Sequence, residues 1–141
     1  VLDIGCGYGI LGLFASRCGA QSIDMLDSNV LAVASTQENI ARSGINNCRV
    51  TTSDLFAALP QKKYSLILTN PPFHAGKQID YQITHTLIAD SYAFLETNGT
   101  LLLVANRFIP YDRLMIEVFG NISTLAQTTA YQVLASKKVQ V

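Results

Sequence analysis

The sequence predicts an α/β fold built on a mostly parallel sheet. Short apolar segments of strand length alternate along the chain with longer segments in which apolar residues recur at helical spacing. Parallel strands need crossover connections, which are usually helices, so this alternation favours a parallel sheet. Of the 141 residues, 49% are hydrophobic, which is enough to bury a sizeable core within one domain.

The predicted elements follow one another without a linker, repeat or low-complexity stretch. We expect seven strands, with helices on both faces of the sheet. The strands are expected at Val1–Ile4, Ser22–Leu26, Arg49–Thr52, Tyr64–Thr69, Thr100–Ala105, Ser123–Ala126 and Tyr131–Ala135. The helices are expected at Leu11–Cys18, Asn29–Ser43, Tyr81–Leu95 and Tyr111–Phe119. Gly19, Gly44 and Gly99 stand where helix C-caps are expected, and Ser28 is expected to cap the second helix.

A glycine-rich turn follows the first predicted strand. Its glycines alternate, at Gly5, Gly7 and Gly9. Glycine is needed where the backbone takes a positive φ or comes into contact with a ligand. The spacing from Gly7 through Gly9 to Gly12 also matches the dinucleotide fingerprint, and Asp27 stands where that fingerprint has its ribose-binding acid. The glycines alone therefore do not separate NAD from S-adenosylmethionine.

Two further features favour S-adenosylmethionine. Asp3 lies inside the strand before the turn, where a carboxylate suits a cationic sulfonium and an α-amino group but not a pyrophosphate. The run Asn70-Pro71-Pro72-Phe73 has no role in hydride transfer. Its prolines remove two backbone donors, so the Asn70 amide oxygen and the Pro71 carbonyl can converge as acceptors on one NH₂ group. Phe73 offers a ring face on which a base can stack. The alternative is a simple turn after a strand.

Acidic residues follow the second and third predicted strands, at the edge where parallel sheets bind ligands. Asp27 closes the second strand, where its carboxylate can accept both hydroxyls of a ribose; the alternative is a helix-initiating aspartate. Asp54 follows the third strand and is placed to receive an adenine amine, with Leu55 or Phe56 beside the ring; the alternative is a loop cap. Asp24 lies within a strand, so we expect it to be structural.

The remaining polar residues give weaker indications. His74 is placed to approach a target base or to shape the turn, and Arg107 to meet a phosphate, a base edge or solvent. Lys62 and Lys63 are expected to be solubilising charges. The formal net charge of +0 provides no general electrostatic attraction for RNA phosphates.

The chain resembles the class I S-adenosylmethionine-dependent methyltransferases, and within them the ribosomal RNA guanine-N2 methyltransferases of the bacterial methyltransferase small domain group. The resemblance is carried by Val1 to Gly9, Asp27, Asp54, the run Asn70 to His74 with Gly76, and the segment Val104 to Tyr111. It implies a Rossmann-like fold, S-adenosyl-L-methionine as cofactor, ribosomal RNA or a ribosomal subunit as partner, and no metal. It also implies a further N-terminal domain, so we expect residues 1–141 to be the catalytic domain of a longer parent.

Together, the residues and the resemblance predict three groups of site residues. The catalytic group is Asn70, Pro71, Pro72 and Phe73. The cofactor-binding group is Asp3, Gly5, Cys6, Gly7, Gly9, Asp27, Ser28, Asp54, Leu55 and Asn70. The substrate-binding group is Phe73, His74 and Arg107.

Other functions remain open at the level of sequence. Adenine-N6 and protein glutamine-N5 methyltransferases use a similar tetrapeptide. A catalytically silent domain that binds cofactor or RNA is the alternative from another class, and it would be marked by damage to the two motifs, which are intact. The three cysteines form no Cys-x-x-Cys pair, so neither a disulfide framework nor a zinc site is indicated, and we expect reduced thiols in the cytoplasm. No apolar run approaches the roughly 20 residues that span a bilayer.

Overall fold

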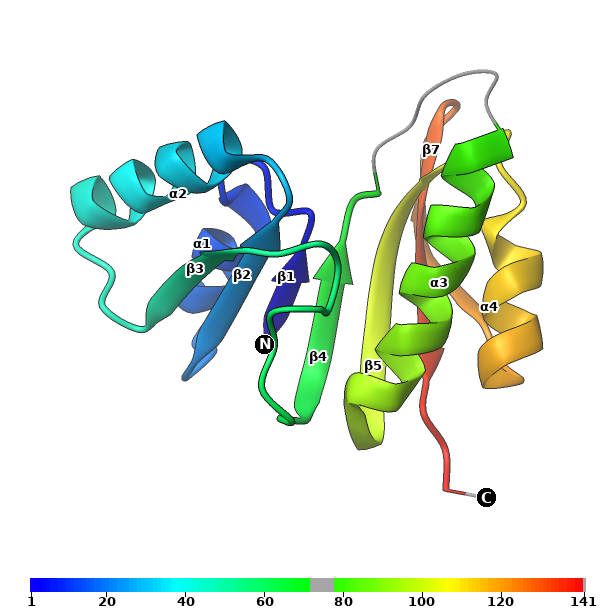
Figure 1. Cartoon of the computed structure of the whole chain (residues 1–141). Coiled ribbons are helices and arrows are strands. Elements are labelled where there is room, and N and C mark those ends of the chain that lie inside the picture. The colour runs from blue at the N-terminus through cyan, green and yellow to red at the C-terminus, as the bar shows by residue number, and fades with distance from the viewer. Residues whose placement is uncertain (72–77, 141) are drawn as a thin grey trace. The chain divides into compact units, whose positions relative to one another are not determined.

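The computed structural model of the chain (Figure 1) describes residues 1–71 and 78–140, without the side chains of residues 78–80. Seven strands and four helices follow one another along this part of the chain, and a helix separates most successive strands. The chain divides into two compact units, Val1–Lys62 and Lys63–Val141. The predicted fold class, α/β with a seven-stranded and mostly parallel sheet, is confirmed.

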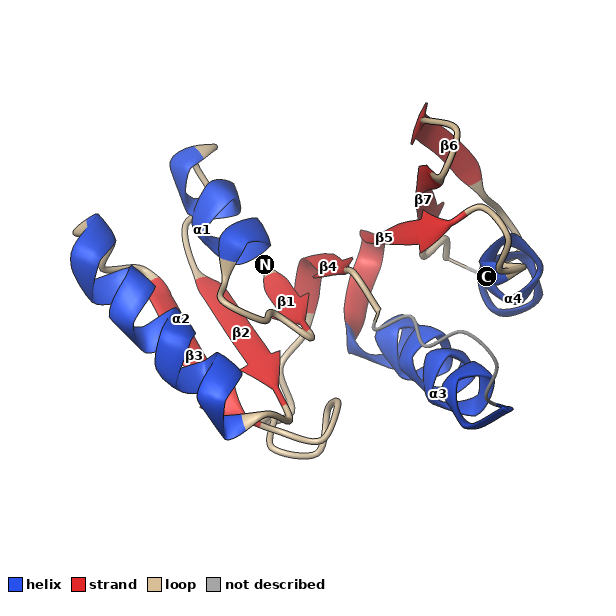
Figure 2. Cartoon of the chain, turned by 90° about the horizontal axis from the view of Figure 1, so that it is seen from above, coloured by secondary structure: helices blue, strands red, loops and turns tan. Residues whose placement is uncertain are grey.

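The first unit contains three parallel strands and two helices. Its elements are β1 (Leu2–Ile4), α1 (Ile10–Arg17), β2 (Ile23–Asp27), α2 (Val30–Ser43) and β3 (Cys48–Thr52). The strands lie in the order β3-β2-β1. Both crossovers therefore step in the same direction, and right-handed connections place α1 and α2 on one face of these strands. Figure 2 shows the two helices beside them.

Strands β1 and β2 of the first unit are buried along nearly their whole length, whereas β3 is partly exposed. All three residues of β1 and the first four of β2 are buried, including Leu2, Ile4 and Met25. Such continuous burial is typical of strands that are covered on both faces of a parallel sheet.

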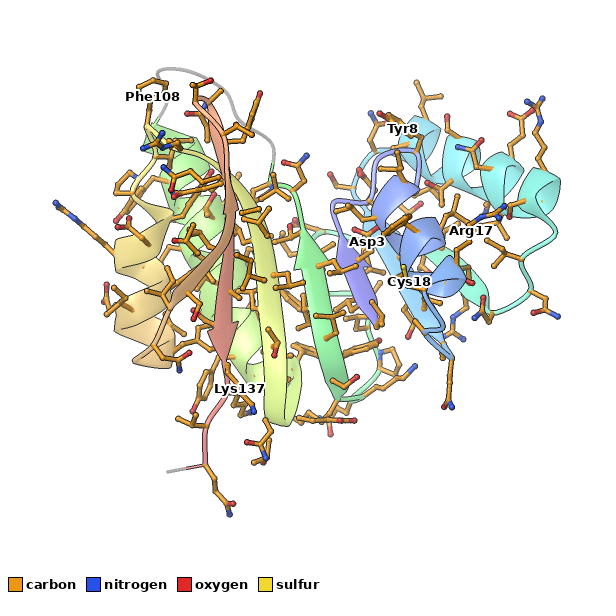
Figure 3. All side chains as sticks on the ribbon, turned by 180° about the vertical axis from the view of Figure 1, so that it is seen from behind. Asp3, Tyr8, Arg17, Cys18, Phe108 and Lys137 are labelled. Carbon is orange, nitrogen blue, oxygen red and sulfur yellow. The ribbon has the colours of Figure 1, made fainter. Side chains whose placement is uncertain are left out.

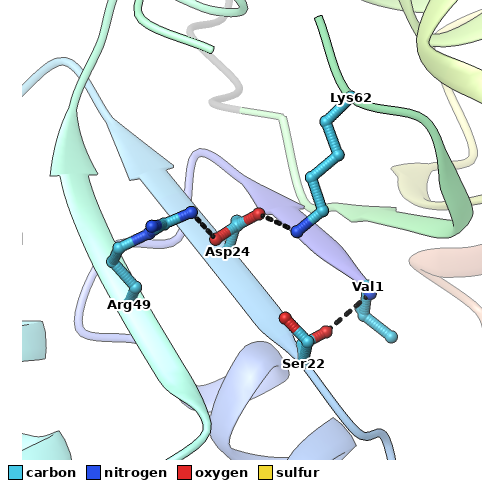
Figure 4. A network of polar contacts seen from close by, with 5 residues as sticks. All are labelled: Val1, Ser22, Asp24, Arg49 and Lys62. Atoms are coloured by element: carbon cyan, nitrogen blue, oxygen red, sulfur yellow. Dashed lines mark hydrogen bonds and ion pairs between the residues drawn. The ribbon is translucent and has the colours of Figure 1, made fainter. Parts of the chain in front are cut away.

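Asp24 is a buried charge within β2, and two cations from its own unit neutralise it (Figure 4). Its Oδ1 lies 2.9 Å from the Arg49 guanidinium, and its Oδ2 lies 2.9 Å from Lys62 Nζ. A buried carboxylate is tolerated when it is paired in this way. The structural role expected for Asp24 is confirmed, whereas Lys62 is an ion-pair partner rather than a freely solvated charge.

The second unit contains the other four strands. Its elements are β4 (Tyr64–Thr69), α3 (Gln78–Phe94), β5 (Leu95–Asn106), α4 (Tyr111–Phe119), β6 (Ser123–Gln127) and β7 (Tyr131–Lys137). The strands lie in the order β4-β5-β7-β6, with β4 and β5 parallel and β7 antiparallel to both of its neighbours. Helices α3 and α4 pack against each other, and the Tyr92 and Phe119 rings meet edge to face at 5.2 Å.

The element predicted least well is β5, which begins at Leu95 rather than at Thr100. Gly99 was expected to be a helix C-cap, but it lies inside this strand. A Cβ atom there would stand 2.9 Å from the Glu96 carbonyl, so the position requires glycine because backbone segments approach closely. Asn98 has a φ of 68°, and its N–H donates to the Lys138 carbonyl at 2.8 Å. This partner lies far along the chain, so local pattern could not reveal the extended strand.

The caps of the first unit agree in part with expectation. Gly44 ends α2 in the left-handed conformation, with a φ of 69°, as predicted. Gly19, with a φ of 96°, follows Cys18, which is the C-cap of α1. The N-cap of α2 is Asn29 and not Ser28, because the Asn29 Oδ1 accepts the Leu31 N–H at 2.9 Å. Asparagine and serine are both good N-caps, so residue type alone does not decide between them.

Gly12 lies at the closest contact between α1 and the strands, so we expect Gly12→Ala to destabilise the protein. The new methyl group would collide with Met25, which is fully buried, and would stand 3.2 Å from Asp3 Oδ2. Overpacking of this kind costs about 1–3 kcal/mol, although alanine is the better helix former. Urea denaturation measures the effect. The matched control is Ala34→Gly on the exposed side of α2, which should cost only about 1 kcal/mol. A Gly12→Ala variant as stable as the parent would contradict this account of the packing.

Candidate functional site

The turn between β1 and α1 has an unusual backbone. Gly5, Gly7 and Gly9 all have positive φ, at 68°, 58° and 89°. Side chains added at Gly5 or Gly7 would meet nothing within 4 Å, so the backbone there borders open space. A side chain at Gly9 would instead meet Thr36 Cγ2 at 2.8 Å. We refer to Gly5–Gly9 as the glycine loop, and it presents bare main chain at the carboxyl end of β1.

Asp3 lies on β1 where the strand faces α1 (Figure 3). Its side chain is almost fully buried, and its Oδ2 accepts the Gly12 N–H at 2.8 Å. Its Oδ1 is buried without a hydrogen-bond partner in the described part of the chain. Burial raises the pKa of this carboxyl to about 6; the Gly12 hydrogen bond opposes the rise, and the nearby Asp27 charge adds to it. A cation or an N–H donor reaching Oδ1 would stabilise the ionised carboxylate and so oppose this rise in pKa.

Asp27 ends β2 as predicted, and its carboxylate bridges two turns. Oδ2 accepts the Gly7 N–H and Oδ1 accepts the Asn29 N–H, each at 2.9 Å. Its main-chain carbonyl accepts the Ser53 N–H at 2.9 Å. Asp27 therefore joins the glycine loop, the start of α2 and the segment after β3. Each carboxylate oxygen has a second lone pair, so the group can still accept two further hydrogen bonds.

The segment after β3 carries the next predicted residues. Asp54 is exposed, and Leu55 is partly exposed with a φ of 46°. Ser53 holds this bend, because its hydroxyl donates to the Leu55 carbonyl at 2.8 Å and accepts the Ala58 N–H at 3.0 Å. Phe56 is buried in the core. Of the two residues expected beside a ring, only Leu55 is accessible to a ligand.

Two smaller residues of the predicted site differ in their surroundings. Ser28 is exposed next to Asp27. Cys6 is buried, and its Sγ lies 3.7 Å from the Thr36 hydroxyl. Burial raises the pKa of the Cys6 thiol to about 11. Cys6 is therefore a neutral thiol at physiological pH, and it packs rather than reacts.

Asn70 follows directly after β4, in the second unit. Its side chain is exposed, while Pro71 is buried. The other predicted residues of this run, Pro72, Phe73 and His74, lie outside the described residues. The exposed Asn70 side chain thus lies at the carboxyl end of β4.

Arg107 and Phe108 follow β5. The Arg107 guanidinium donates to the Thr128 carbonyl at 3.2 Å, and its main-chain N–H donates to the Ala130 carbonyl at 3.0 Å. Arg107 thus ties this loop to the turn between β6 and β7. Phe108 is 84% exposed and stands out from the same loop (Figure 3). A large exposed aromatic beside a candidate site is suited to stacking, and sequence analysis did not single it out.

Two polar residues of α2 that the sequence analysis passed over contact the glycine loop. The Thr36 hydroxyl donates to the Gly7 carbonyl, and the Asn39 amide donates to the Tyr8 carbonyl, both at 2.8 Å. One feature of the sequence could have revealed the contact of Thr36. It is a polar residue three positions after Val33, within an otherwise apolar stripe of the helix.

No group of three or more His, Cys, Asp or Glu side chains in the described part of the chain is arranged to hold a metal ion. None of the helices described there is both long enough and apolar enough to cross a membrane.

An α/β sheet of this strand order, with a glycine loop after β1 and an acid at the end of β2, defines the class I methyltransferase fold. The family model of the methyltransferase small domain matches residues 1–135, and the chain belongs to that family.

Individual relatives agree with this assignment. The chain is 35% identical over 139 residues to ribosomal RNA small subunit methyltransferase C of Vibrio vulnificus, covering 98% of this chain and 40% of the relative. It is 38% identical over 134 residues to the protein of that name from Actinobacillus succinogenes, covering 94% of this chain and 40% of the relative. It also matches a solved T. thermophilus 16S rRNA N2 guanine methyltransferase in complex with AdoMet and guanosine. That match has a TM-score of 0.87 and 31% identity and covers 97% of this chain and 36% of the other. The chain thus spans about two fifths of the length of the curated relatives it matches.

The buried Asp3 predicts a pH-dependent stability. The folded protein holds a proton on Asp3 more tightly than the unfolded chain, because the pKa rises from 3.8 to about 6 on folding. This contribution to the free energy of unfolding is therefore full below about pH 4 and is lost as the pH rises through about 6, by roughly 3 kcal/mol in total. Urea denaturation between pH 4 and 7 should show this loss in the parent but not in Asp3→Asn. The exposed Asp112→Asn serves as control and should retain the loss. Parallel curves for the parent and Asp3→Asn would contradict the assignment to Asp3.

Proposed function

We propose that this chain is the catalytic domain of an S-adenosylmethionine-dependent methyltransferase that modifies the exocyclic N2 amine of a guanine in ribosomal RNA. The observation that carries the proposal is the 31% identity, over 97% of this chain, to an N2 guanine methyltransferase that binds AdoMet and guanosine. The adenine-N6 and glutamine-N5 alternatives share the Asn-Pro-Pro-Phe run, so the chemical identity of the methylated product decides between them and the proposal. The partner would be ribosomal RNA or a ribosomal subunit, and the site of action the cytoplasm.

The first unit suits S-adenosylmethionine in its charge and its open main chain. The unpartnered Asp3 Oδ1 is a buried acceptor next to a loop whose glycines border open space. A cationic ligand is favoured there, because it would offset the cost of an ionised Asp3 beside Asp27. The residues of this unit that would hold the cofactor are Asp3, Gly5, Cys6, Gly7, Gly9, Asp27, Ser28, Asp54 and Leu55.

Roles within this group follow from the chemistry of each side chain. The free lone pairs of Asp27 suit the two ribose hydroxyls. The exposed Asp54 carboxylate suits the adenine amine, and Leu55 offers an apolar surface to the ring. Gly5, Cys6, Gly7 and Gly9 would contribute main chain. When bound, the cofactor supplies an electrophilic methyl group on a sulfonium sulfur.

The second unit would hold and orient the amine. Guanine N2 is a weak nucleophile because its lone pair is delocalised into the ring. Acceptors at the Asn70 side chain and the Pro71 carbonyl would hold both N–H bonds and direct the lone pair, and Pro72 would keep the turn rigid. Phe73 would stack the flipped base, with His74 and Arg107 as further contacts to the RNA. No strong base is needed, because the proton becomes acidic once nitrogen is alkylated. Such positioning contributes about 7–11 kcal/mol when the geometry is near-attack.

Asp27 should be the main determinant of cofactor affinity. We expect Asp27→Ala to weaken S-adenosylmethionine binding by about 1.5–3 kcal/mol, the range for hydrogen bonds to a charged group. Isothermal titration measures the change. Adenosine has the ribose without the sulfonium, so it should lose a similar amount. Glu117→Ala, which removes an exposed carboxylate of α4, is the control. Unchanged affinity in Asp27→Ala would remove Asp27 from the site.

Asn70 should act in the transition state rather than in cofactor binding. We expect Asn70→Ala to leave cofactor affinity nearly unchanged and to lower kcat and kcat/KM together, by about 10²–10³, as for loss of one oxyanion-hole donor. Phe73→Ala should in addition weaken capture of the RNA base. The test is single-turnover methyl transfer to rRNA with saturating cofactor, followed by nucleoside mass spectrometry.

The control for this series is Asn46→Ala, which removes an exposed asparagine from the other unit. It should methylate at the rate of the parent. A rate for Asn70→Ala within threefold of the parent would mean that the tetrapeptide is only a turn. Methylated adenine in place of N2-methylguanine would overturn the choice of substrate.

A further inference from the structure

Helix α2 binds the glycine loop through two side chains on one of its faces. Thr36 and Asn39 are three residues apart and are therefore neighbours on the helix surface. Their donors reach successive carbonyls of the loop, those of Gly7 and Tyr8, both at 2.8 Å. Neither residue is next to the loop in sequence, and both contacts lie within the first unit.

The contact at Thr36 is buried and closely packed. Thr36 is 0% exposed, so its hydroxyl needs a partner, and the Gly7 carbonyl is that partner. Its methyl group stands where a side chain at Gly9 would lie, and its hydroxyl is 3.7 Å from Cys6 Sγ. Thr36 therefore contacts the loop at three residues, Cys6, Gly7 and Gly9, and leaves it little freedom to rotate.

These contacts determine where the Gly7–Tyr8 peptide directs its N–H group. In a planar trans peptide the N–H points opposite to the C=O. Because the Gly7 carbonyl points to Thr36, the Tyr8 N–H points away from α2. No acceptor in the described part of the chain receives it. The next peptide shows the same rule, because the Tyr8 carbonyl points to Asn39 while the Gly9 N–H donates to the Cys6 carbonyl at 2.8 Å.

We propose that Thr36 and Asn39 are positioning residues that preorganise the glycine loop for its ligand. By holding two loop carbonyls against α2, they keep the Tyr8 N–H directed outward as a donor for an acceptor group of the cofactor. Preorganisation raises affinity because less conformational freedom is lost on binding. This inference rests on the proposed binding of S-adenosylmethionine by the first unit.

The test compares variants that differ by single groups. Thr36→Val removes the hydroxyl and keeps the shape, Thr36→Ser keeps the hydroxyl and removes the methyl group, and Asn39→Asp exchanges the amide donor for an acceptor. Gln37→Ala, on the exposed side of α2, is the control. For each protein, the Kd of S-adenosylmethionine is measured by titration, the Tm without ligand by scanning calorimetry, and loop-amide exchange by hydrogen–deuterium exchange.

We expect Thr36→Val and Asn39→Asp each to weaken binding about threefold to tenfold, as for loss of one hydrogen bond. Thr36→Ser and Gln37→Ala should stay within about twofold of the parent. The amides of the glycine loop should exchange faster in the two weakened variants, while those of β1 and β2 stay protected.

The outcomes separate this inference from the proposed function. A parent protein that does not bind S-adenosylmethionine overturns the proposed function and this inference with it. A parent that binds, with the Kd and loop exchange of Thr36→Val and Asn39→Asp unchanged, overturns the inference alone, whatever happens to the Tm. If Thr36→Val fails to fold, the Kd and loop exchange of Asn39→Asp are compared with those of Thr36→Ser. Unchanged values in Asn39→Asp then overturn the inference.

Discussion

The first unit depends on hydrogen bonds that hold the left-handed backbone of the glycine loop in place. The loop has three glycines at positive φ, a conformation that residues with a side chain rarely adopt. Three side chains from different elements secure it and the helix that follows. Asp3 accepts the Gly12 N–H, Asp27 accepts the Gly7 N–H, and Thr36 donates to the Gly7 carbonyl. These three residues belong to β1, β2 and α2. Assembly of these elements therefore sets the loop conformation.

The same contacts give the loop its electrostatic character. Two carboxylates, Asp3 and Asp27, face main-chain N–H groups within one small region, and no cation balances them among the hydrogen-bond partners described for either. Burial disfavours the charge on Asp3, and Asp27 disfavours it further, which raises the Asp3 pKa to about 6. The protein thus tolerates a buried acid whose second oxygen has no partner in the described chain. Such unsatisfied groups are rare in cores and are typical of functional sites.

The candidate residues of the second unit also follow parallel strands. Asn70 and Arg107 each come directly after a strand, β4 and β5, and these two strands are parallel, so both residues leave the sheet at the same edge. Arg107, Asn70 and Phe108 are all exposed, and the Arg107 guanidinium also donates to the Thr128 carbonyl of the neighbouring turn. All three residues are therefore accessible to a ligand, and Arg107 in addition ties the loop that presents Phe108 to the turn between β6 and β7.

The sequence alone determined the α/β class, the order of the elements and the location of the glycine loop, Asp27, Asp54 and Asn70. These features depend on local periodicity, on glycine conformation and on the rule that ligand-binding residues follow parallel strands. Only the tertiary structure decided the roles of Lys62 and Thr36, the burial of Phe56 and the extension of β5 through Gly99. Each of these depends on a partner distant in sequence: Asp24, the Gly7 carbonyl, the hydrophobic core and the Lys138 backbone. Contacts of this kind form only when the chain folds, and no local pattern encodes them.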